Sequence, residues 1–108
     1  MSVTRTFTVT VSNPGSGNKY YIDGVLTPTL ELVEGATFKF DQSDSSNGTG
    51  GTHPLRFATA ADAAGGTEYT TNVTTSGTPG SSGAYTQIEV ASGAPTLYYY
   101  CTNHSGMG

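Results

Sequence analysis

The chain has 108 residues, a length that holds one domain but not two independent cores. Threonine, glycine and serine occupy 45 positions, only 12 residues are charged, and the net charge is −4 with no basic cluster. Because proteins bind nucleic-acid phosphates through lysine and arginine, this composition disfavours nucleic-acid binding, and no segment approaches the roughly 20 consecutive apolar residues of a membrane span.

Short alternating segments follow one another along the chain and predict β-strands. Residues 3–11 alternate strictly between threonine and larger side chains, which is the strongest strand pattern in the sequence. Further strands are predicted at residues 20–22, 29–33, 37–40, 55–57, 69–73, 84–90 and 96–100. Turn-forming residues fill 41–52, and a faint helical pattern covers 58–64. Seven or eight short strands joined by Gly- and Ser-bearing turns predict one all-β domain over residues 1–108, a β-sandwich or barrel.

The large apolar side chains lie almost entirely within these segments. Because a sandwich buries one face of each strand, we expect them to pack between two sheets. The predicted core comprises Phe7, Val9, Ile22, Leu30, Leu32, Phe38, Phe40, Leu55, Phe57, Ile88, Val90, Leu97 and Tyr99.

A thiol, an imidazole and a thioether fall within seven residues near the C-terminus, at Cys101, His104 and Met107. Soft sulfur ligands together with imidazole nitrogen select copper, and the recurring copper arrangement has two histidines and one cysteine in a plane with a weak axial methionine. The other histidine of the chain is His53, at the junction between the loop and the strand 55–57. Loops cluster at the two ends of a sandwich. The sequence therefore predicts a mononuclear copper site formed by these four residues.

Other interpretations of these residues remain open. The single cysteine excludes an internal disulfide, and Cys101 alone is more often a small buried hydrophobe than a ligand. Zinc is the second candidate metal, although methionine is not among its usual ligands. A cysteine hydrolase is disfavoured, because Cys101 and His104 share one tight loop without a third residue to orient them, so we expect no enzymatic activity. Asp41, Asp44 and Asn47 faintly resemble a calcium loop but lack its final carboxylate.

The motif Cys101-Thr102-Asn103-His104-Ser105-Gly106-Met107, with His53 upstream, resembles the ligand set of the cupredoxins, the blue-copper β-sandwich family. Residues 34–41 look like the central strand of that family, so the resemblance spans roughly residues 20–108. It implies a Greek-key sandwich of about seven strands with a type 1-like copper site at His53, Cys101, His104 and Met107.

One departure from the family concerns the end of the chain. A cupredoxin has a further strand after its axial methionine, whereas this chain stops one residue past Met107. The absent strand is expected from a longer chain or from another chain; alternatively, the amino-terminal strand 3–11 covers the edge. An unpaired edge is an association site, so we expect contacts there with copies of this chain or with other virion proteins.

A second resemblance concerns the biological setting. Residues 53–57, 69–71, 76–81 and 98–108 look closer still to a cupredoxin-like module in proteins of marine cyanophages. That resemblance implies a decoration or tail-associated component of a virion. The first residues lack the apolar stretch of a secretory signal, which agrees with such a location. The alternative is a soluble blue-copper electron carrier in the periplasm or cytoplasm, although the uncharged surroundings of His104 offer little for partner docking.

Overall fold

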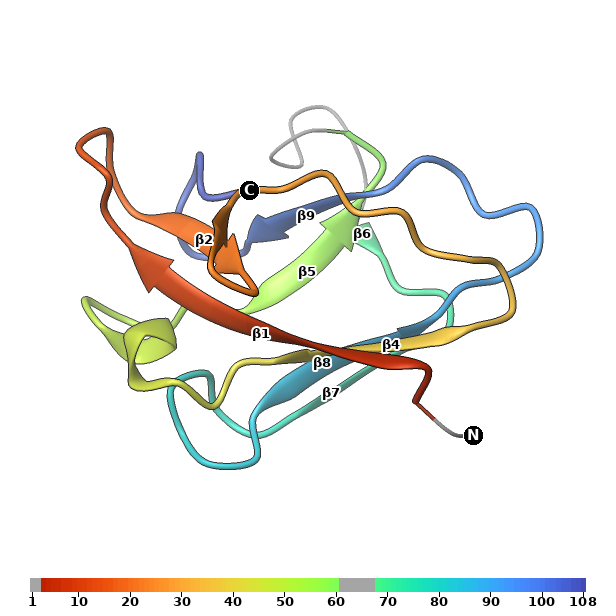
Figure 1. Ribbon diagram of the computed structural model, residues 1–108, viewed down its shortest axis with the longest axis horizontal. Coiled ribbons are helices and arrows are strands. Elements are labelled where there is room, and N and C mark those ends of the chain that lie inside the picture. Colours follow the sequence, from red (N-terminus) through yellow and green to blue (C-terminus); the bar gives the residue numbers. More distant parts are fainter. Residues whose placement is uncertain (1–2, 61–67) are drawn as a thin grey trace.

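The computed structural model describes residues 3–60 and 68–108, and these residues form two β-sheets (Figure 1). The larger sheet has the strand order β3-β2-β1-β4-β8-β7, with β1 (Arg5–Ser12), β2 (Lys19–Ile22), β3 (Val25–Leu26), β4 (Thr37–Asp41), β7 (Val73–Ser76) and β8 (Tyr85–Glu89). The smaller sheet has the order β6-β5-β9, with β5 (Leu55–Ala58), β6 (Glu68–Tyr69) and β9 (Tyr98–Cys101). The helix in the described residues is the 3₁₀ turn η1 (Ser45–Gly48). The predicted all-β class is confirmed, with nine strands in the described part of the chain.

The amino-terminal strand β1 lies inside the larger sheet. It pairs antiparallel with β2 and parallel with β4, and both partners are continued outward by further antiparallel strands. In Figure 1, β1 crosses the molecule beside β4, whereas β5 and β9 run together in the other sheet. Of the three alternatives for the absent strand, the one in which residues 3–11 cover the edge beside the C-terminal loop is therefore wrong, because that edge belongs to β9 in the smaller sheet.

Aromatic side chains join the two sheets. Phe40 of β4 stacks on Phe7 of β1 at a centroid distance of 5.0 Å and meets the edge of Phe57 of β5 at 5.4 Å. Such offset and edge-on pairs add to the hydrophobic gain from burial. Nine of the predicted core residues are buried as expected: Phe7, Val9, Ile22, Phe38, Phe40, Leu55, Phe57, Ile88 and Val90. The other four, Leu30, Leu32, Leu97 and Tyr99, are only partly buried.

The segment 29–33 is not a strand, although its sequence alternates as predicted. Leu30 and Leu32 face inward and are half-buried, whereas the residues between and beside them are exposed. Within the described residues, no strand pairs with this segment. The N–H and C=O groups of a strand form hydrogen bonds with a neighbouring strand. Alternation of the side chains alone was therefore not sufficient to predict a strand here.

The predicted strand 69–73 is divided in two. Asn72 adopts a positive φ of 57°, and the Val73 amide donates to the Thr70 carbonyl, so a turn separates β6 from β7. Asparagine tolerates this left-handed conformation better than most residues. Of the faint helical pattern at 58–64, Ala58 is the last residue of β5, and residues 61–64 lie outside the described residues.

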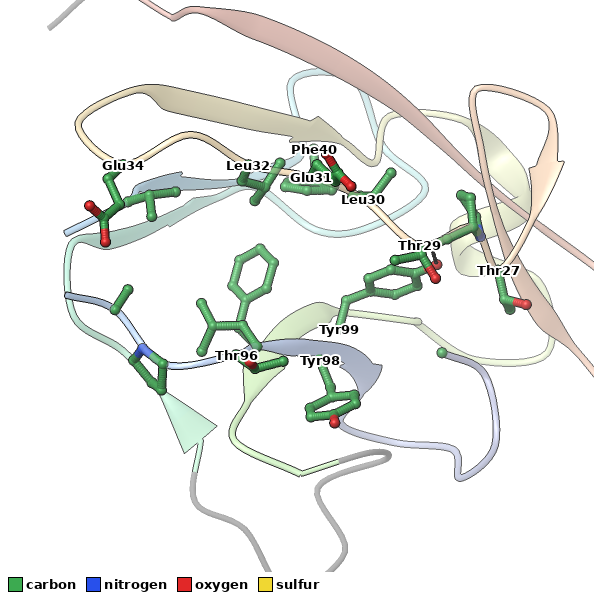
Figure 2. Close-up of a pocket in the computed structure, with 17 residues that line it drawn as sticks. Thr27, Thr29, Leu30, Glu31, Leu32, Glu34, Phe40, Thr96, Tyr98 and Tyr99 are labelled. Carbon is green, nitrogen blue, oxygen red and sulfur yellow. Dashed lines mark hydrogen bonds between the residues drawn. The ribbon is translucent and has the colours of Figure 1, made fainter. Parts of the chain in front are cut away.

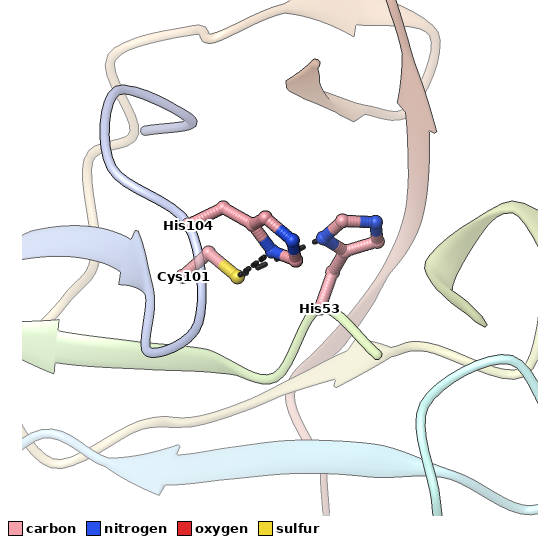
Figure 3. Close-up of side chains that lie close together, drawn as sticks. All are labelled: His53, Cys101 and His104. Atoms are coloured by element: carbon pink, nitrogen blue, oxygen red, sulfur yellow. Dashed lines mark hydrogen bonds between the residues drawn. The ribbon is translucent and has the colours of Figure 1, made fainter. Parts of the chain in front are cut away.

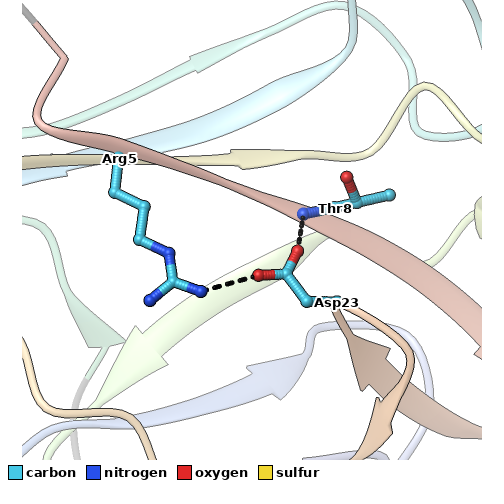
Figure 4. Close-up of polar contacts among 3 residues, drawn as sticks. All are labelled: Arg5, Thr8 and Asp23. Carbon is cyan, nitrogen blue, oxygen red and sulfur yellow. Dashed lines mark hydrogen bonds and ion pairs between the residues drawn. The ribbon is translucent and has the colours of Figure 1, made fainter.

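The β2–β3 hairpin is tied to β1 through Asp23 (Figure 4). The Asp23 carboxylate accepts a hydrogen bond from the Thr8 amide at 2.8 Å and pairs with the Arg5 guanidinium at 2.9 Å. Both charged side chains are solvent-exposed, so the ion pair itself contributes little to stability. The contact to the backbone is the part that fixes the hairpin against its neighbouring strand.

Candidate metal centre

The pairing of β5 with β9 determines which loops meet at the end of the smaller sheet. Leu55 is opposite Cys101 in this antiparallel pair. Beyond the pair, the main-chain amide of Thr102 donates a hydrogen bond to the Pro54 carbonyl at 3.3 Å. The side-chain amide of Asn103 donates another to the Thr52 carbonyl at 3.0 Å. The strand register therefore continues into the two loops. His53, two residues before Leu55, is brought beside the residues that follow Cys101.

Three of the four predicted ligands converge at this point (Figure 3). The Cys101 sulfur lies 3.8 Å from Nδ1 of His53 and 3.7 Å from Nδ1 of His104. One ligand atom from each residue lies within 4.8 Å of those of the other two, and the two imidazole rings are 4.5 Å apart at their centroids. All three donor atoms face the same small space, so the trio could hold one metal ion.

The His53 ring is oriented by the loop that precedes it. Its Nε2 atom is 2.8 Å from the carbonyl oxygen of Thr49. A carbonyl oxygen only accepts hydrogen bonds, so Nε2 carries a proton, and in the neutral ring Nδ1 presents a lone pair to Cys101 and His104. A metal-bound histidine commonly donates its second ring nitrogen to a carbonyl in this way, which fixes the tautomer and the ring orientation.

The main chain of His53 is fixed by three neighbours in the interior. Its amide donates to the Asn47 carbonyl at 2.8 Å. Its carbonyl accepts from the Tyr20 hydroxyl at 2.6 Å and from the Gln42 side-chain amide at 2.7 Å. His53 is 0% exposed, so each of these bonds satisfies a polar group that has no access to water. The ligand is therefore held in place whether or not an ion is bound.

Gln42 and Asn47 form a buried polar network that the sequence analysis missed. The Gln42 side chain donates to the Asn47 side-chain oxygen at 3.0 Å and accepts from the Leu55 amide at 2.9 Å, and Asn47 donates to the Val9 carbonyl at 2.8 Å. The network thus joins both sheets to the loop that carries His53. Gln42 continues the inward alternation of Phe38 and Phe40, and this period of two was the available signal.

Tyr20 of β2 lies next to the thiol. Burial raises the pKa of the Tyr20 phenol, and the neighbouring Cys101 adds to the rise. The phenol is therefore neutral in the folded protein and can donate its proton to the His53 carbonyl, as observed. A neutral hydroxyl beside Cys101 adds no negative charge that would oppose a thiolate ligand.

His104 is the most accessible member of the trio. His53 and Cys101 are buried, whereas His104 is half-buried. Gly51 lies against its ring with a positive φ of 111°, and a Cβ atom at Gly51 would sit 3.7 Å from Cε1 of His104. A side chain at this position would therefore make ordinary van der Waals contact with the ring, so Gly51 lies directly beside it.

Met107, the fourth predicted ligand, is buried at the end of the same loop. The side chain is 1% exposed and belongs to the hydrophobic core. Its carbonyl accepts a hydrogen bond from the Tyr20 amide at 2.9 Å, and the Lys19 ammonium group donates to the Gly106 carbonyl. These contacts attach the loop to β2. The role of the Met107 thioether as a ligand stays a prediction.

The acidic residues of the faint calcium pattern have other roles. Asp41 accepts hydrogen bonds from the amide and hydroxyl of Ser43, and Asp44 accepts from the amide and hydroxyl of Ser46 at the start of η1. The Ser46 hydrogen bonds hold the pKa of the Asp44 carboxyl below its usual value. Asp41 is the last residue of β4 and Asp44 is the N-cap of η1, so both carboxylates bond the turn residues that follow them, as the ordinary interpretation of this segment predicted.

Comparisons of the chain with family models, with curated proteins and with solved structures found no match. In the described residues, no helix has the length and apolar character needed to cross a membrane.

Proposed function

We propose that this chain is a cupredoxin-like, Greek-key module that binds one copper ion through His53, Cys101 and His104, with Met107 as a weak axial ligand. The supporting observation is the pair of sulfur–nitrogen distances, 3.8 and 3.7 Å. With bonds of about 2.0 Å to nitrogen and about 2.3 Å to sulfur, a trigonal angle separates the two donors by about 3.7 Å, and a tetrahedral angle by about 3.5 Å. Both ideal separations are close to the observed ones, so the distances support one shared ion, and the preference for copper rests on the softness of the donor set.

The proposed role of the module is structural, as a component of a virus particle. An ion that binds only the folded chain stabilises it, and here it would join the loop before β5 to the loop after β9. The surroundings of His104 (Thr102, Asn103 and Ser105) are polar and uncharged, which suits a structural surface better than docking of a redox partner. Support for the particle itself is the resemblance of residues 53–57 and 98–108 to the cyanophage module.

A non-enzymatic role is part of the proposal. Cys101 is only 3% exposed. A nucleophilic thiol must be reached by its substrate, and reactive cysteines are partly exposed for that reason. Burial of the thiol therefore disfavours a nucleophilic role.

An electron carrier is the second candidate, and the half-buried ring of His104 favours it. A ligand whose edge reaches solvent gives an electron a short path between a bound ion and a partner. The two candidates share the same ion site and differ in what the ion does there.

Titration of the purified protein with copper(II) tests the site. An intense blue charge-transfer band at one equivalent of copper is expected, because the Cys101 thiolate bonds to the ion. Cys101→Ser should abolish the band, whereas Ser105→Ala, in the same loop but exposed, should keep it. A wild-type protein that stays colourless with copper, or that binds only zinc, would exclude the proposed site.

Two further measurements separate the roles. A carrier gives a reversible voltammetric wave and exchanges electrons quickly between copies, whereas a structural ion gives slow exchange and a large rise in melting temperature. Mass spectrometry of purified cyanophage particles encoding this chain should detect its peptides. Their absence from the particles, together with fast electron exchange, would favour the carrier.

A further inference from the structure

Two adjacent residues of β2, Lys19 and Tyr20, contact both loops that carry the proposed ligands. The Lys19 ammonium group donates a hydrogen bond to the Gly106 carbonyl. The main-chain amide of Tyr20 donates to the next carbonyl along the loop, that of Met107, at 2.9 Å. The Tyr20 hydroxyl donates to the His53 carbonyl at 2.6 Å. We call Lys19 and Tyr20 the β2 anchor, because together they join the loop before β5 to the loop after β9.

The Tyr20 half of the β2 anchor is held in place by Tyr99. The Tyr20 ring is buried and meets the Tyr99 ring edge-on at a centroid distance of 6.4 Å. Tyr99 extends from β9 across a cavity of about 740 Å³ (Figure 2), and its hydroxyl donates to the Pro28 carbonyl at 2.6 Å. The ring that packs against Tyr20 is therefore attached at both of its ends, so Tyr20 keeps its position whether or not an ion is bound.

The ligand loop, residues 101–107, is attached near its start and near its end. Near its start, Thr102 and Asn103 bond the segment before β5, as described above. Near its end, the β2 anchor holds two successive carbonyls. His104 lies between these attachments and is half-buried. The position of the His104 ring therefore depends on how firmly both ends of the loop are held.

Lys19 directs its charge at a carbonyl rather than at an acid. Among the described residues, Arg5 and Asp23 form the ion pair, whereas the Lys19 ammonium group bonds the Gly106 carbonyl. Gly106 adopts a positive φ of 74°, and a Cβ atom there would sit 3.6 Å from the Lys19 nitrogen. The ammonium group thus lies directly against the loop. A hydrogen bond from a charged donor is stronger than one from a neutral donor, so this contact is a firm attachment.

The charge of Lys19 also bears on the oxidation state of a bound ion. Residues 49–53 and 101–107 contain no lysine, arginine, aspartate or glutamate, so Lys19 brings a positive charge to loops that have no fixed charge of their own. Copper(II) bound by one thiolate and neutral ligands retains one positive charge, whereas copper(I) with the same ligands is neutral overall. A neighbouring cation therefore raises the energy of the oxidised state more than that of the reduced state.

We propose that Lys19 is a positioning residue of the ion site, which holds the Gly106 end of the ligand loop in the metal-free protein and favours the reduced state of a bound copper ion. The proposal rests on the copper site proposed above and names a residue that controls it. Its hydrogen bond acts on the ligands through the main chain of the loop, and its charge acts on the ion through space. Contacts just outside a set of metal ligands commonly tune the metal in both ways.

The test compares two lysine variants that change the net charge equally. Lys19→Met keeps a long unbranched side chain but removes both the donor and the charge. Lys39→Met is the matched control, because Lys39 is also half-buried on a strand, but its ammonium group lies over the Tyr85 ring at 4.4 Å. Lys19→Arg retains a charged donor and should behave like the wild type in both measurements below.

The first measurement uses the metal-free protein. NMR relaxation should show lower backbone order parameters at residues 104–107 in Lys19→Met than in the wild type, and unchanged values in Lys39→Met. In the wild-type protein, the Lys19 ammonium nitrogen should show scalar coupling across the hydrogen bond to the Gly106 carbonyl carbon. This coupling tests the contact even if Lys19→Met does not fold, and its absence would contradict the proposal.

The second measurement uses the copper-loaded protein. Voltammetry should show a lower reduction potential for Lys19→Met, equal to a change of about threefold or more in the ratio of copper(I) to copper(II) affinity. Lys39→Met should change this ratio by less than about 1.5-fold, because solvent and salt screen a distant charge. Equal effects of the two variants in either measurement would overturn the proposal. A wild-type protein that binds no copper would refute the proposed function, whereas the order parameters would still decide whether Lys19 holds the loop.

Discussion

The Gln42 side chain donates a 2.7 Å hydrogen bond to the main-chain carbonyl of His53. Gln42 directly follows β4 of the larger sheet, and His53 precedes β5 of the smaller sheet. The bond therefore crosses between the layers and is made by a side chain that is only 1% exposed. Buried amides of this kind fix one arrangement of the chain, because every alternative leaves polar groups without partners.

Gln42→Leu should destabilise the protein by about 2–4 kcal/mol, since the Leu55 amide and the Asn47 side-chain oxygen lose their partner in the interior. Chemical denaturation of the metal-free protein measures this loss. Gln87→Leu, the same change at a half-buried position on β8, is the control and should cost less than about 1 kcal/mol. Equal effects of the two substitutions would show that the buried network is unimportant.

Removal of the proposed ion should lower the melting temperature by roughly 10–20 °C. A ligand at about 100 times its dissociation constant stabilises the folded state by about 2.7 kcal/mol, and 1 kcal/mol corresponds to roughly 4–8 °C in a small domain. Calorimetry with copper and with a chelator measures the difference. Cys101→Ser should melt at the same temperature in both conditions. A wild-type melting temperature that is the same with copper and with the chelator would contradict this prediction.

The tautomer of His53 should be visible before any metal is added. Because Nε2 donates to the Thr49 carbonyl, long-range proton–nitrogen NMR spectra should show a protonated Nε2 and an unprotonated Nδ1. A diamagnetic ion such as copper(I) should then shift the Nδ1 resonance and leave the Nε2 proton in place. Observation of the opposite tautomer in the metal-free protein would mean that the ring does not present Nδ1 to Cys101.

Stability should fall at alkaline pH because of the buried tyrosines. Burial raises the pKa of Tyr99 to about 12, from an ordinary value of 10.0. The folded state thus favours the neutral phenol, so this contribution is complete below pH ~10 and is lost as the pH rises from ~10 towards ~12. The pKa of Tyr20 is raised as well, so its phenol should ionise only when the protein unfolds.

Ultraviolet titration of tyrosinate checks the alkaline behaviour. Exposed tyrosines should titrate first and Tyr99 later, together with Tyr100, whose pKa burial also raises, and Tyr99→Phe should reduce the amplitude of the later step. The same variant loses the hydrogen bond to the Pro28 carbonyl, so its free energy of unfolding should fall by about 1 kcal/mol near neutral pH. A single titration step for all tyrosines in the folded protein would contradict the prediction.

The sequence was sufficient to predict those features that depend on local alternation. Strands such as β1 and β8 and the core residues Phe40 and Ile88 alternate with a period of two, and the structure has them as predicted. The proximity of His53 to Cys101 also followed, because a chain with two histidines and one cysteine offers few ways to assemble such a site.

Features that depend on distant partners were not predictable in the same way. Leu30 and Leu32 alternate as strand residues do, but whether they form a strand depends on what lies beside them in space. Asn47 stands in a run of turn-forming residues that suggested an exposed loop, and its burial is explained by its contacts with Val9 and Gln42. A polar side chain is buried where it finds hydrogen-bond partners that are distant in the sequence. The composition of a segment does not show which partners these are.

The register of β5 against β9 has an evolutionary consequence for insertions and deletions. Leu55 opposite Cys101 sets the position of His53, so a slip of one residue in either strand would turn an inward-facing side chain outward. Extra residues at the exposed tip around Gly50, by contrast, would leave that alignment intact. Length variation among descendants of this gene should therefore accumulate at the loop tip and be selected against in the short stretches that adjoin His53 and Cys101.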